Sequence, residues 1–182
     1  MKKLATGVMI ALLVGGSAAA ENLSFSFGTN FVRPNDGRFQ ASQGTSFLLS
    51  WAAEGWTFGV LNENNNLAGN TAAGALVAGT LAVSGIRLSR EVVKMVSVGL
   101  GIGAAAVTLP VPAATTINRP AVDVVGTVNI LSGKGDKVSG SLDAVVSARF
   151  INLQGTGAAL VAGQLVSNLD GVNLGLAVTA GF

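Results

Sequence analysis

The stretch that decides the fold runs from Val172 to Phe182 and reads VNLGLAVTAGF. Its even-numbered positions are all apolar and end on an aromatic, whereas its odd-numbered positions are small or polar. Such strict alternation indicates a β-strand with two different faces, because successive side chains of a strand point to opposite sides. The stretch therefore predicts a strand with one fully apolar face.

Seven earlier segments repeat this pattern. In the run from Val96 to Gly103, for example, Val, Leu and Ile alternate with Ser and Gly. The eight predicted strands span about 22–31, 45–53, 55–62, 76–88, 92–107, 121–131, 137–151 and 172–182. Most reach the ~9–11 residues that a tilted membrane-crossing strand needs. We therefore expect an all-β chain that forms an eight-stranded antiparallel up-and-down transmembrane β-barrel, with its apolar faces outward.

The sequence of one strand predicts a change of its apolar face partway along. Val77, Leu81 and Val83 lie at odd positions, whereas Ile86 and Leu88 lie at even positions. A β-bulge near Gly85 would explain the change, because one extra residue reverses the two faces of a strand.

The connections between these strands alternate in length. Short turns are expected at 53–54, 89–91 and 132–136, and long segments at 32–44, 63–75, 108–120 and 152–171. Tight periplasmic turns and longer external loops are typical of bacterial barrels. Polar runs at 33–37 and 62–66 suit external loops.

The N-terminus has the features of a secretory signal peptide. Lys2 and Lys3 precede an apolar run, and Ala18 to Ala20 provide a small-residue cleavage site. We expect residues 1–20 to be a signal peptide and 21–182 to be the barrel. Of 11 Lys and Arg residues, two lie in the signal peptide, so the mature chain has 9 basic and 9 acidic residues. This balance leaves no basic patch for nucleic acid.

The composition excludes several kinds of chemistry. The chain has no Cys and no His, which removes thiolate nucleophiles, disulfides and the most common general base and metal ligand. Gly99, Gly101 and Gly103 lie inside an alternating strand without a following helix signal, so they do not indicate a phosphate-binding loop. We therefore expect no enzymatic activity, no catalytic residue, no cofactor and no metal site.

The whole mature chain resembles small eight-stranded outer-membrane barrels of the OmpX and OmpA transmembrane-domain type. The resemblance implies location in the outer membrane of a Gram-negative bacterium, contact with outer-membrane lipid, and delivery by the barrel-assembly machinery. It implies that the terminal aromatic strand is the assembly signal, through Leu174, Leu176, Val178 and Phe182. The strand order also places aromatic residues at the two membrane interfaces, namely Phe31, Phe47 and Phe150 at the outer rim and Trp51, Trp56 and Phe182 at the periplasmic rim.

The opposite strand faces would line the barrel interior. They carry mostly Ser, Thr, Asn and Gly, and they also carry Asp123 and Arg149 on neighbouring strands. An unpaired charge in so confined an interior would be costly, so we expect Asp123 and Arg149 to form a lumenal ion pair. Eight strands leave little more space than side chains fill, which favours a closed interior over a pore.

Two functions remain open from the sequence. The first is a structural or surface-interaction role through the four long external loops. The second is a porin-like role as a narrow channel or carrier for small solutes. Long uncharged segments such as 95–118 could also suggest membrane helices, but their period of two and their glycines argue against helices. A secreted β-sandwich would need polar outer faces, which these strands lack.

Overall fold

The computed structural model describes residues 22–70, 74, 76–109, 115–135, 138–157 and 165–182. The predicted signal peptide, residues 1–20, lies outside these residues. The described chain forms nine strands: β1 (Leu23–Pro34), β2 (Phe39–Gln40), β3 (Ser42–Ala53), β4 (Trp56–Asn70), β5 (Leu76–Val93), β6 (Val96–Leu109), β7 (Thr115–Lys134), β8 (Ser139–Phe150) and β9 (Gly171–Gly181). In this part of the chain, no helix is long and apolar enough to cross a membrane.

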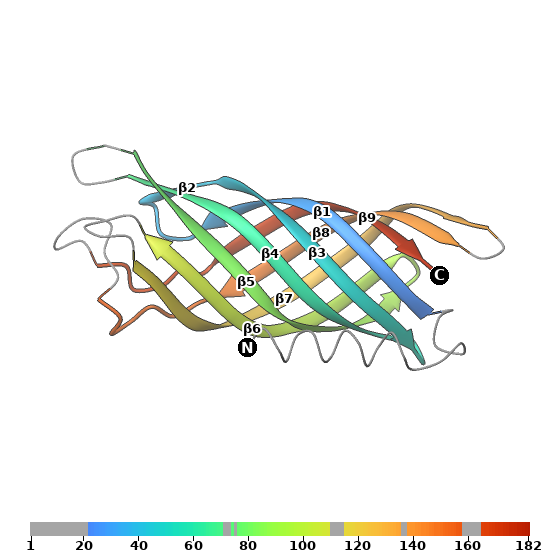
Figure 1. The fold of residues 1–182 in the computed structure, drawn as a ribbon. Coiled ribbons are helices and arrows are strands. Elements are labelled where there is room, and N and C mark those ends of the chain that lie inside the picture. Colours follow the sequence, from blue (N-terminus) through green and yellow to red (C-terminus); the bar gives the residue numbers. More distant parts are fainter. Residues whose placement is uncertain (1–21, 71–73, 75, 110–114, 136–137, 158–164) are drawn as a thin grey trace.

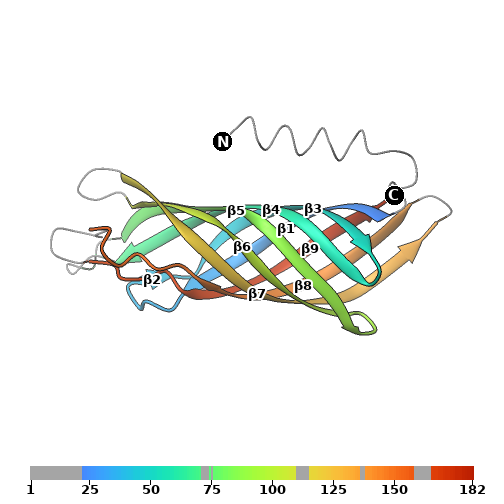
Figure 2. The same cartoon turned by 90° about the horizontal axis from the view of Figure 1, so that it is seen from below.

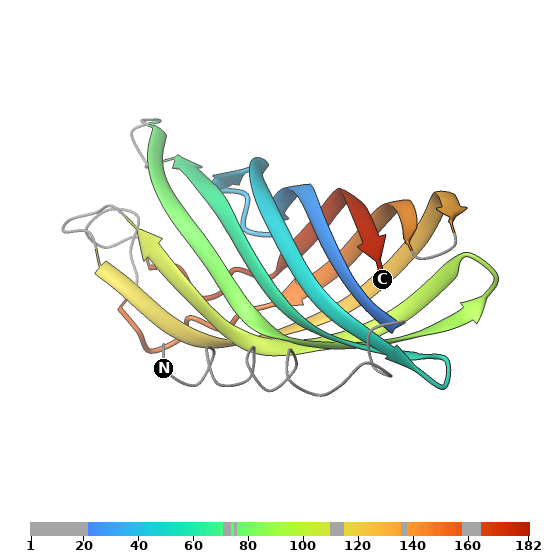
Figure 3. The same cartoon turned by 45° about the vertical axis from the view of Figure 1, so that its right-hand side comes forward.

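Eight of the strands close into a barrel. Each long strand pairs antiparallel with the next one along the chain, and β9 returns to pair with β1, for example at Phe27 opposite Val178. The ninth strand, β2, adds only two residues beside β4. The strands cross the barrel obliquely, as Figures 1 and 3 show. The predicted all-β, eight-stranded, antiparallel up-and-down barrel is confirmed, with one additional short strand.

The two ends of the barrel differ. We call the end with the β3–β4, β5–β6 and β7–β8 connections the turn end, and the opposite end the loop end. Glu54 and Gly55 form the first turn and Lys94 and Met95 the second, with positive φ at Glu54, Gly55 and Met95. At the turn end, the β5–β6 and β7–β8 hairpins extend beyond the neighbouring strands (Figure 2).

The outer face of the barrel is an exposed apolar belt. Leu88, Leu100 and Val124 lie side by side on β5, β6 and β7, and each is 45% to 61% exposed. Toward the loop end the outward residues become polar, as at Asn62 and Ser84, which are hydrogen-bonded across β4 and β5. The belt therefore ends at a polar boundary while the strands continue beyond it.

The inner face has three layers along the barrel. The turn-side layer is rich in hydroxyl groups, such as Ser26 and Thr179. The middle layer holds buried charges, which are described below. The loop-side layer is an apolar cluster of 13 buried residues that includes Leu81, Val107 and Ile151.

The predicted bulge near Gly85 is wrong. The β4–β5 register is continuous from Trp56 to Asn70, and the β5–β6 register is continuous from Thr80 to Glu91. Val77, Leu81 and Val83 face inward, whereas Ile86 and Leu88 face outward. The apparent change of face arises because the interior itself is apolar at the loop end. Register shifts occur instead between Glu91 and Val93 and between Asn129 and Leu131.

The strands are longer than predicted at both ends. β4 continues through the Asn-rich run 62–66 to Asn70, and β7 starts at Thr115, so most of the expected loops 63–75 and 108–120 are strand. Residues 89–91, expected to be a turn, belong to β5. Sequence polarity was misleading here because Asn64 and Asn66 face outward beyond the belt, while Leu67 faces the buried cluster.

Two glycines allow β5 and β6 to approach closely. Gly85 lies opposite Gly103, and a Cβ at Gly103 would overlap the Ser84 carbonyl oxygen and approach the Gly85 Cα to 2.7 Å. Because both obstacles are backbone atoms, no side-chain rearrangement can relieve the clash.

We predict that Gly103→Ala lowers the free energy of unfolding by about 1–3 kcal/mol, the usual cost of overpacking. Gly133→Ala is the control, since a Cβ there has no described atom within 4 Å and surface changes usually stay within about 0.5 kcal/mol. Urea unfolding monitored by tryptophan fluorescence measures both variants. Equal stability of the two variants would contradict the close approach.

Candidate functional site

Four buried charged side chains occupy the middle of the barrel. Glu63 comes from β4, Arg87 from β5, Asp123 from β7 and Arg149 from β8. Each residue is at most 8% exposed, and Arg149 is only 2% exposed. The two carboxylates and two guanidinium groups have no net charge together, so their charges can compensate one another inside the barrel.

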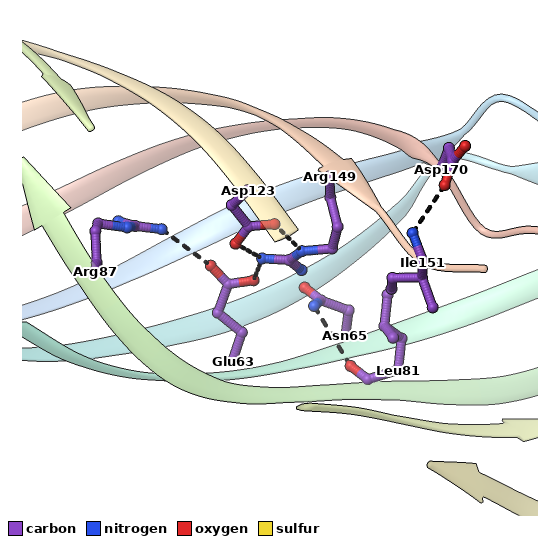
Figure 4. A network of polar contacts seen from close by, with 8 residues as sticks. All are labelled: Glu63, Asn65, Leu81, Arg87, Asp123, Arg149, Ile151 and Asp170. Carbon is purple, nitrogen blue, oxygen red and sulfur yellow. Dashed lines mark hydrogen bonds and ion pairs between the residues drawn. The ribbon is translucent and has the colours of Figure 1, made fainter. Parts of the chain in front are cut away.

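Arg149 is the centre of this cluster. Its Nε donates to Asp123 Oδ1 at 2.7 Å, and its Nη2 donates to Asp123 Oδ2 at 2.9 Å. Such a two-point contact fixes the direction of both groups and is stronger than a contact between neutral partners. Figure 4 shows Arg149 between Asp123 and Glu63. The structure thus contains the ion pair that strand parity predicts, and Asp123 lies directly opposite Arg149 in the β7–β8 register.

Glu63 links the second arginine to this pair. Its Oε2 lies 2.7 Å from Arg149 Nη2, although the geometry is that of an ion pair rather than an aligned hydrogen bond. Its Oε1 lies 3.9 Å from Arg87 Nη2. The order of groups is therefore Asp123, Arg149, Glu63 and Arg87, with alternating charge.

Glycine leaves room for the charged groups on the inner wall. Gly101 on β6 lies between Arg87 on β5 and Asp123 on β7 in the strand registers. A Cβ at Gly101 would approach the Asp123 Cβ to 3.3 Å. The small residue at 101 thus provides space that the Asp123 side chain uses.

A second polar group lies toward the turn end. Asp143 accepts hydrogen bonds from Asn129 Nδ2, Ser141 Oγ and Thr179 Oγ1, each 2.9 Å long. Ser26 Oγ lies 2.7 Å from Thr179 Oγ1. Because the Thr179 hydroxyl donates to Asp143, Ser26 is the donor to Thr179. This carboxylate is therefore stabilised by hydrogen bonds rather than by a cation.

An apolar cap closes the interior on the loop side. Ile151, Leu153, Val166 and Leu169 follow or precede the last two strands, and each is at most 3% exposed. Their backbone is held together by Leu169 N donating to Ile151 O and Leu153 N donating to Ser167 O, both at 2.9 Å. Asp170 Oδ1 also accepts from Ile151 N at 2.8 Å (Figure 4). Of the apolar segment 158–166, residues 158–164 lie outside the described residues.

A loop contact joins the cap to the β1–β3 connection. Arg38 Nε donates to Asp36 Oδ1 at 2.9 Å, and Arg38 Nη2 donates to the Leu165 carbonyl oxygen at 3.0 Å. The hydrogen bond from Arg38 lowers the pKa of the Asp36 carboxyl below its usual value. Asp36 thus orients the guanidinium group that binds the cap.

The predicted interface aromatics all lie on the outer face. Trp51, Trp56 and Phe182 lie at the turn end, where the Arg90 guanidinium lies 5.2 Å from the Trp56 ring centre. Phe31 and Phe150 lie toward the loop end, whereas Phe47 lies in the middle of β3. The exposed fractions of these six residues run from 36% to 55%.

The residues of the predicted assembly signal also face outward. Leu174, Leu176 and Val178 are more than half exposed on β9. Phe182 packs edge-on against Phe25 with ring centres 6.1 Å apart, and its backbone N donates to Leu23 O. Their role in assembly stays a prediction.

Glu63 and Arg87 were missed by sequence reasoning. Glu63 lies in the Asn-rich run that suggested a loop, and Arg87 lies just after the supposed bulge. The signal that could have found Glu63 is the alternation Leu61, Glu63, Asn65 and Leu67, which continues the inward face of β4. Charge balance gave a second signal, because a buried Arg87 needs a carboxylate partner.

The described residues contain no group of three or more His, Cys, Asp or Glu side chains that could hold a metal ion. No protein-family model matches the chain, and no curated protein matches it in sequence.

We predict that Arg149→Met destabilises the barrel by about 3–5 kcal/mol, because it leaves Asp123 and Glu63 buried without their main partner. Arg90→Met is the matched control, since Arg90 is exposed on the outside and its loss, including its contact with the Trp56 ring, should cost no more than about 1 kcal/mol. Urea unfolding measures the free energy of unfolding of both variants. Similar losses for both variants would show that the central cluster is not important for stability.

Proposed function

We propose that this chain is an outer-membrane β-barrel of a Gram-negative bacterium, with a structural or surface-interaction role at its loop end. The proposal assigns it no enzymatic activity and no cofactor. The observation that supports membrane insertion most strongly is the apolar belt with its polar boundary. In a water-soluble barrel, large apolar side chains on nearly every strand would remain exposed.

The height of the belt supports this proposal. On β7 the outward residues are apolar from Val122 to Ile130 and polar at Asn118 and Thr116. At about 3.3 Å per residue and a tilt of about 40°, this segment spans roughly 20 Å, close to the ~25 Å apolar band of outer-membrane barrels. Strand segments beyond Asn62 and Asn118 would then extend into the water outside the membrane.

The closed interior supports a structural role over the alternative of a narrow channel. A solute moving along the axis would meet first the buried charge cluster and then the apolar cap. In the described residues, Ala105, Val107 and Ile151 of the apolar cluster have no exposed surface. Passage would therefore require rearrangement of two packed layers. The loop end, with its extended β4–β5 hairpin and its cap, is the part available to a surface partner.

Membrane insertion predicts opposite outcomes for two exposed positions. Leu100→Arg should cost about 2–4 kcal/mol and reduce insertion into lipid vesicles, because it puts a charge on the lipid-facing side. Asn64→Arg lies outward beyond the belt and should fold and insert like the unchanged protein. Heat-dependent migration on SDS gels measures the folded fraction in vesicles. Unimpaired folding of Leu100→Arg would contradict the membrane proposal, because an exposed leucine on a soluble barrel tolerates arginine.

A non-conducting barrel should be electrically silent. After refolding and insertion into planar lipid bilayers in concentrated KCl, we expect no discrete current steps from the unchanged protein. Insertion is checked separately by protection of the barrel from protease in vesicles. Reproducible current steps from inserted protein would favour the channel alternative.

A further inference from the structure

A small cavity lies on the turn side of the charge cluster. Its volume is about 80 Å³, and its wall includes Asn30, Glu63, Arg87, Ser147 and Asn173. All five residues are more than nine-tenths buried. This cavity therefore has a wall of strongly polar groups that bulk water barely reaches.

Several of these polar atoms lack a partner. Among the described residues, no hydrogen-bond partner is present for Nδ2 and Oδ1 of Asn30, Nδ2 and Oδ1 of Asn173, or Nε of Arg87. Leaving a buried donor or acceptor unsatisfied costs roughly 1–3 kcal/mol for each group. Polar atoms without a partner on three side chains around one cavity indicate that a bound molecule completes their hydrogen bonds.

The wall also defines the chemistry of this molecule. The two carboxamides and Arg87 offer both donors and acceptors, so the occupant must accept and donate. Arg87 and Glu63 carry opposite charges, and three neutral donors already occupy the Asp143 carboxylate, so the atoms still without a partner are mainly those of neutral carboxamides, which suit a neutral molecule better than an ion. At about 30 Å³ per water, the volume suits two or three waters or one molecule of that size.

The cavity adjoins wider spaces at the turn end. A wide cavity of about 370 Å³ at the turn end shares Thr127 and Asp143 with its wall, and another of about 540 Å³ shares Thr179. On the opposite side, Arg149 and the apolar cluster close the path. The neighbouring cavities thus favour entry from the turn end, and the packed layers oppose entry from the loop end.

We propose that the cavity at Asn30, Asn173 and Arg87 is a binding site for a small neutral molecule that both donates and accepts hydrogen bonds, entered only from the turn end. Water is its smallest occupant, and a simple amide is the largest that the volume admits. This inference rests on the barrel interior and not on the proposed membrane location, so it is tested in detergent independently of insertion.

The chain has no cysteine, so single cysteines report access directly. Ser147→Cys places a thiol in the cavity wall, and Val107→Cys places one in the apolar cluster at the same inward orientation. With silver ion as the probe, we expect Ser147→Cys to react at least tenfold faster than Val107→Cys in folded protein. Ser46→Cys, also in the cavity wall, replaces Ser147→Cys if that variant does not fold.

The partnerless carboxamides are tested by replacing them together. Asn30→Leu with Asn173→Leu keeps the branching and the number of side-chain heavy atoms but removes the donors and acceptors. In this background the cysteine at 147 should become at least tenfold slower to react, while heat-dependent gel migration confirms that the barrel is folded. Equal rates at positions 147 and 107, or no slowing in the leucine background, would overturn the proposal.

NMR spectra of the unchanged protein identify the molecule that occupies the cavity. Magnetisation transfer from water to the side-chain amides of Asn30 and Asn173, without saturable shifts on adding acetamide, supports bound water. Saturable shifts of the same amides with acetamide support a solute site. Amides that show neither effect would overturn the assignment.

Discussion

The pairing of β1 with β9 is the constraint on which the rest of the structure depends. Without this contact, the sheet would have two edges with unpaired backbone groups. Closure removes both edges and divides every strand into an inward and an outward face. From that point each side chain is either in the narrow interior or on the outer surface, and its position in the alternation decides which.

The interior accommodates polar groups by three different physical means. On the turn side, hydroxyl and amide donors satisfy Asp143. In the middle, opposite charges compensate one another across four strands. On the loop side, the strands carry inward leucine, valine and alanine, so no polar compensation is needed. The order of these layers explains why the outer belt and the inner apolar cluster occur at different heights along the same strands.

Much of the barrel could be predicted from the sequence because alternation is a local property. The strands around Leu100, Val124 and Leu176 were found correctly, and parity put Asp123 and Arg149 on the inner face of neighbouring strands. The cost of an unpaired buried charge then predicted their ion pair. Alternation fails where both faces have the same character. At Val83 an apolar residue faces inward, and at Asn64 a polar residue faces outward, so the ends of β4 and β5 were misread as a bulge and a loop. Glu63 and Arg87 were missed with them, because the supposed loop and bulge interrupted the alternation that puts both side chains on the inward face.

The distribution of the central charges along the chain has a consequence for folding. Residues 63, 87, 123 and 149 belong to four strands, and Arg149 comes from β8, the last of the four in chain order. A sheet that lacks β8 holds two carboxylates against a single arginine, so its charges are not balanced. Contacts between such distant residues form slowly, since long chain segments must be ordered before they are made. Each opposite pair can form within one hairpin, Glu63 with Arg87 on β4 and β5 and Asp123 with Arg149 on β7 and β8, whereas the contact that joins the two pairs, Glu63 with Arg149, requires the closed barrel.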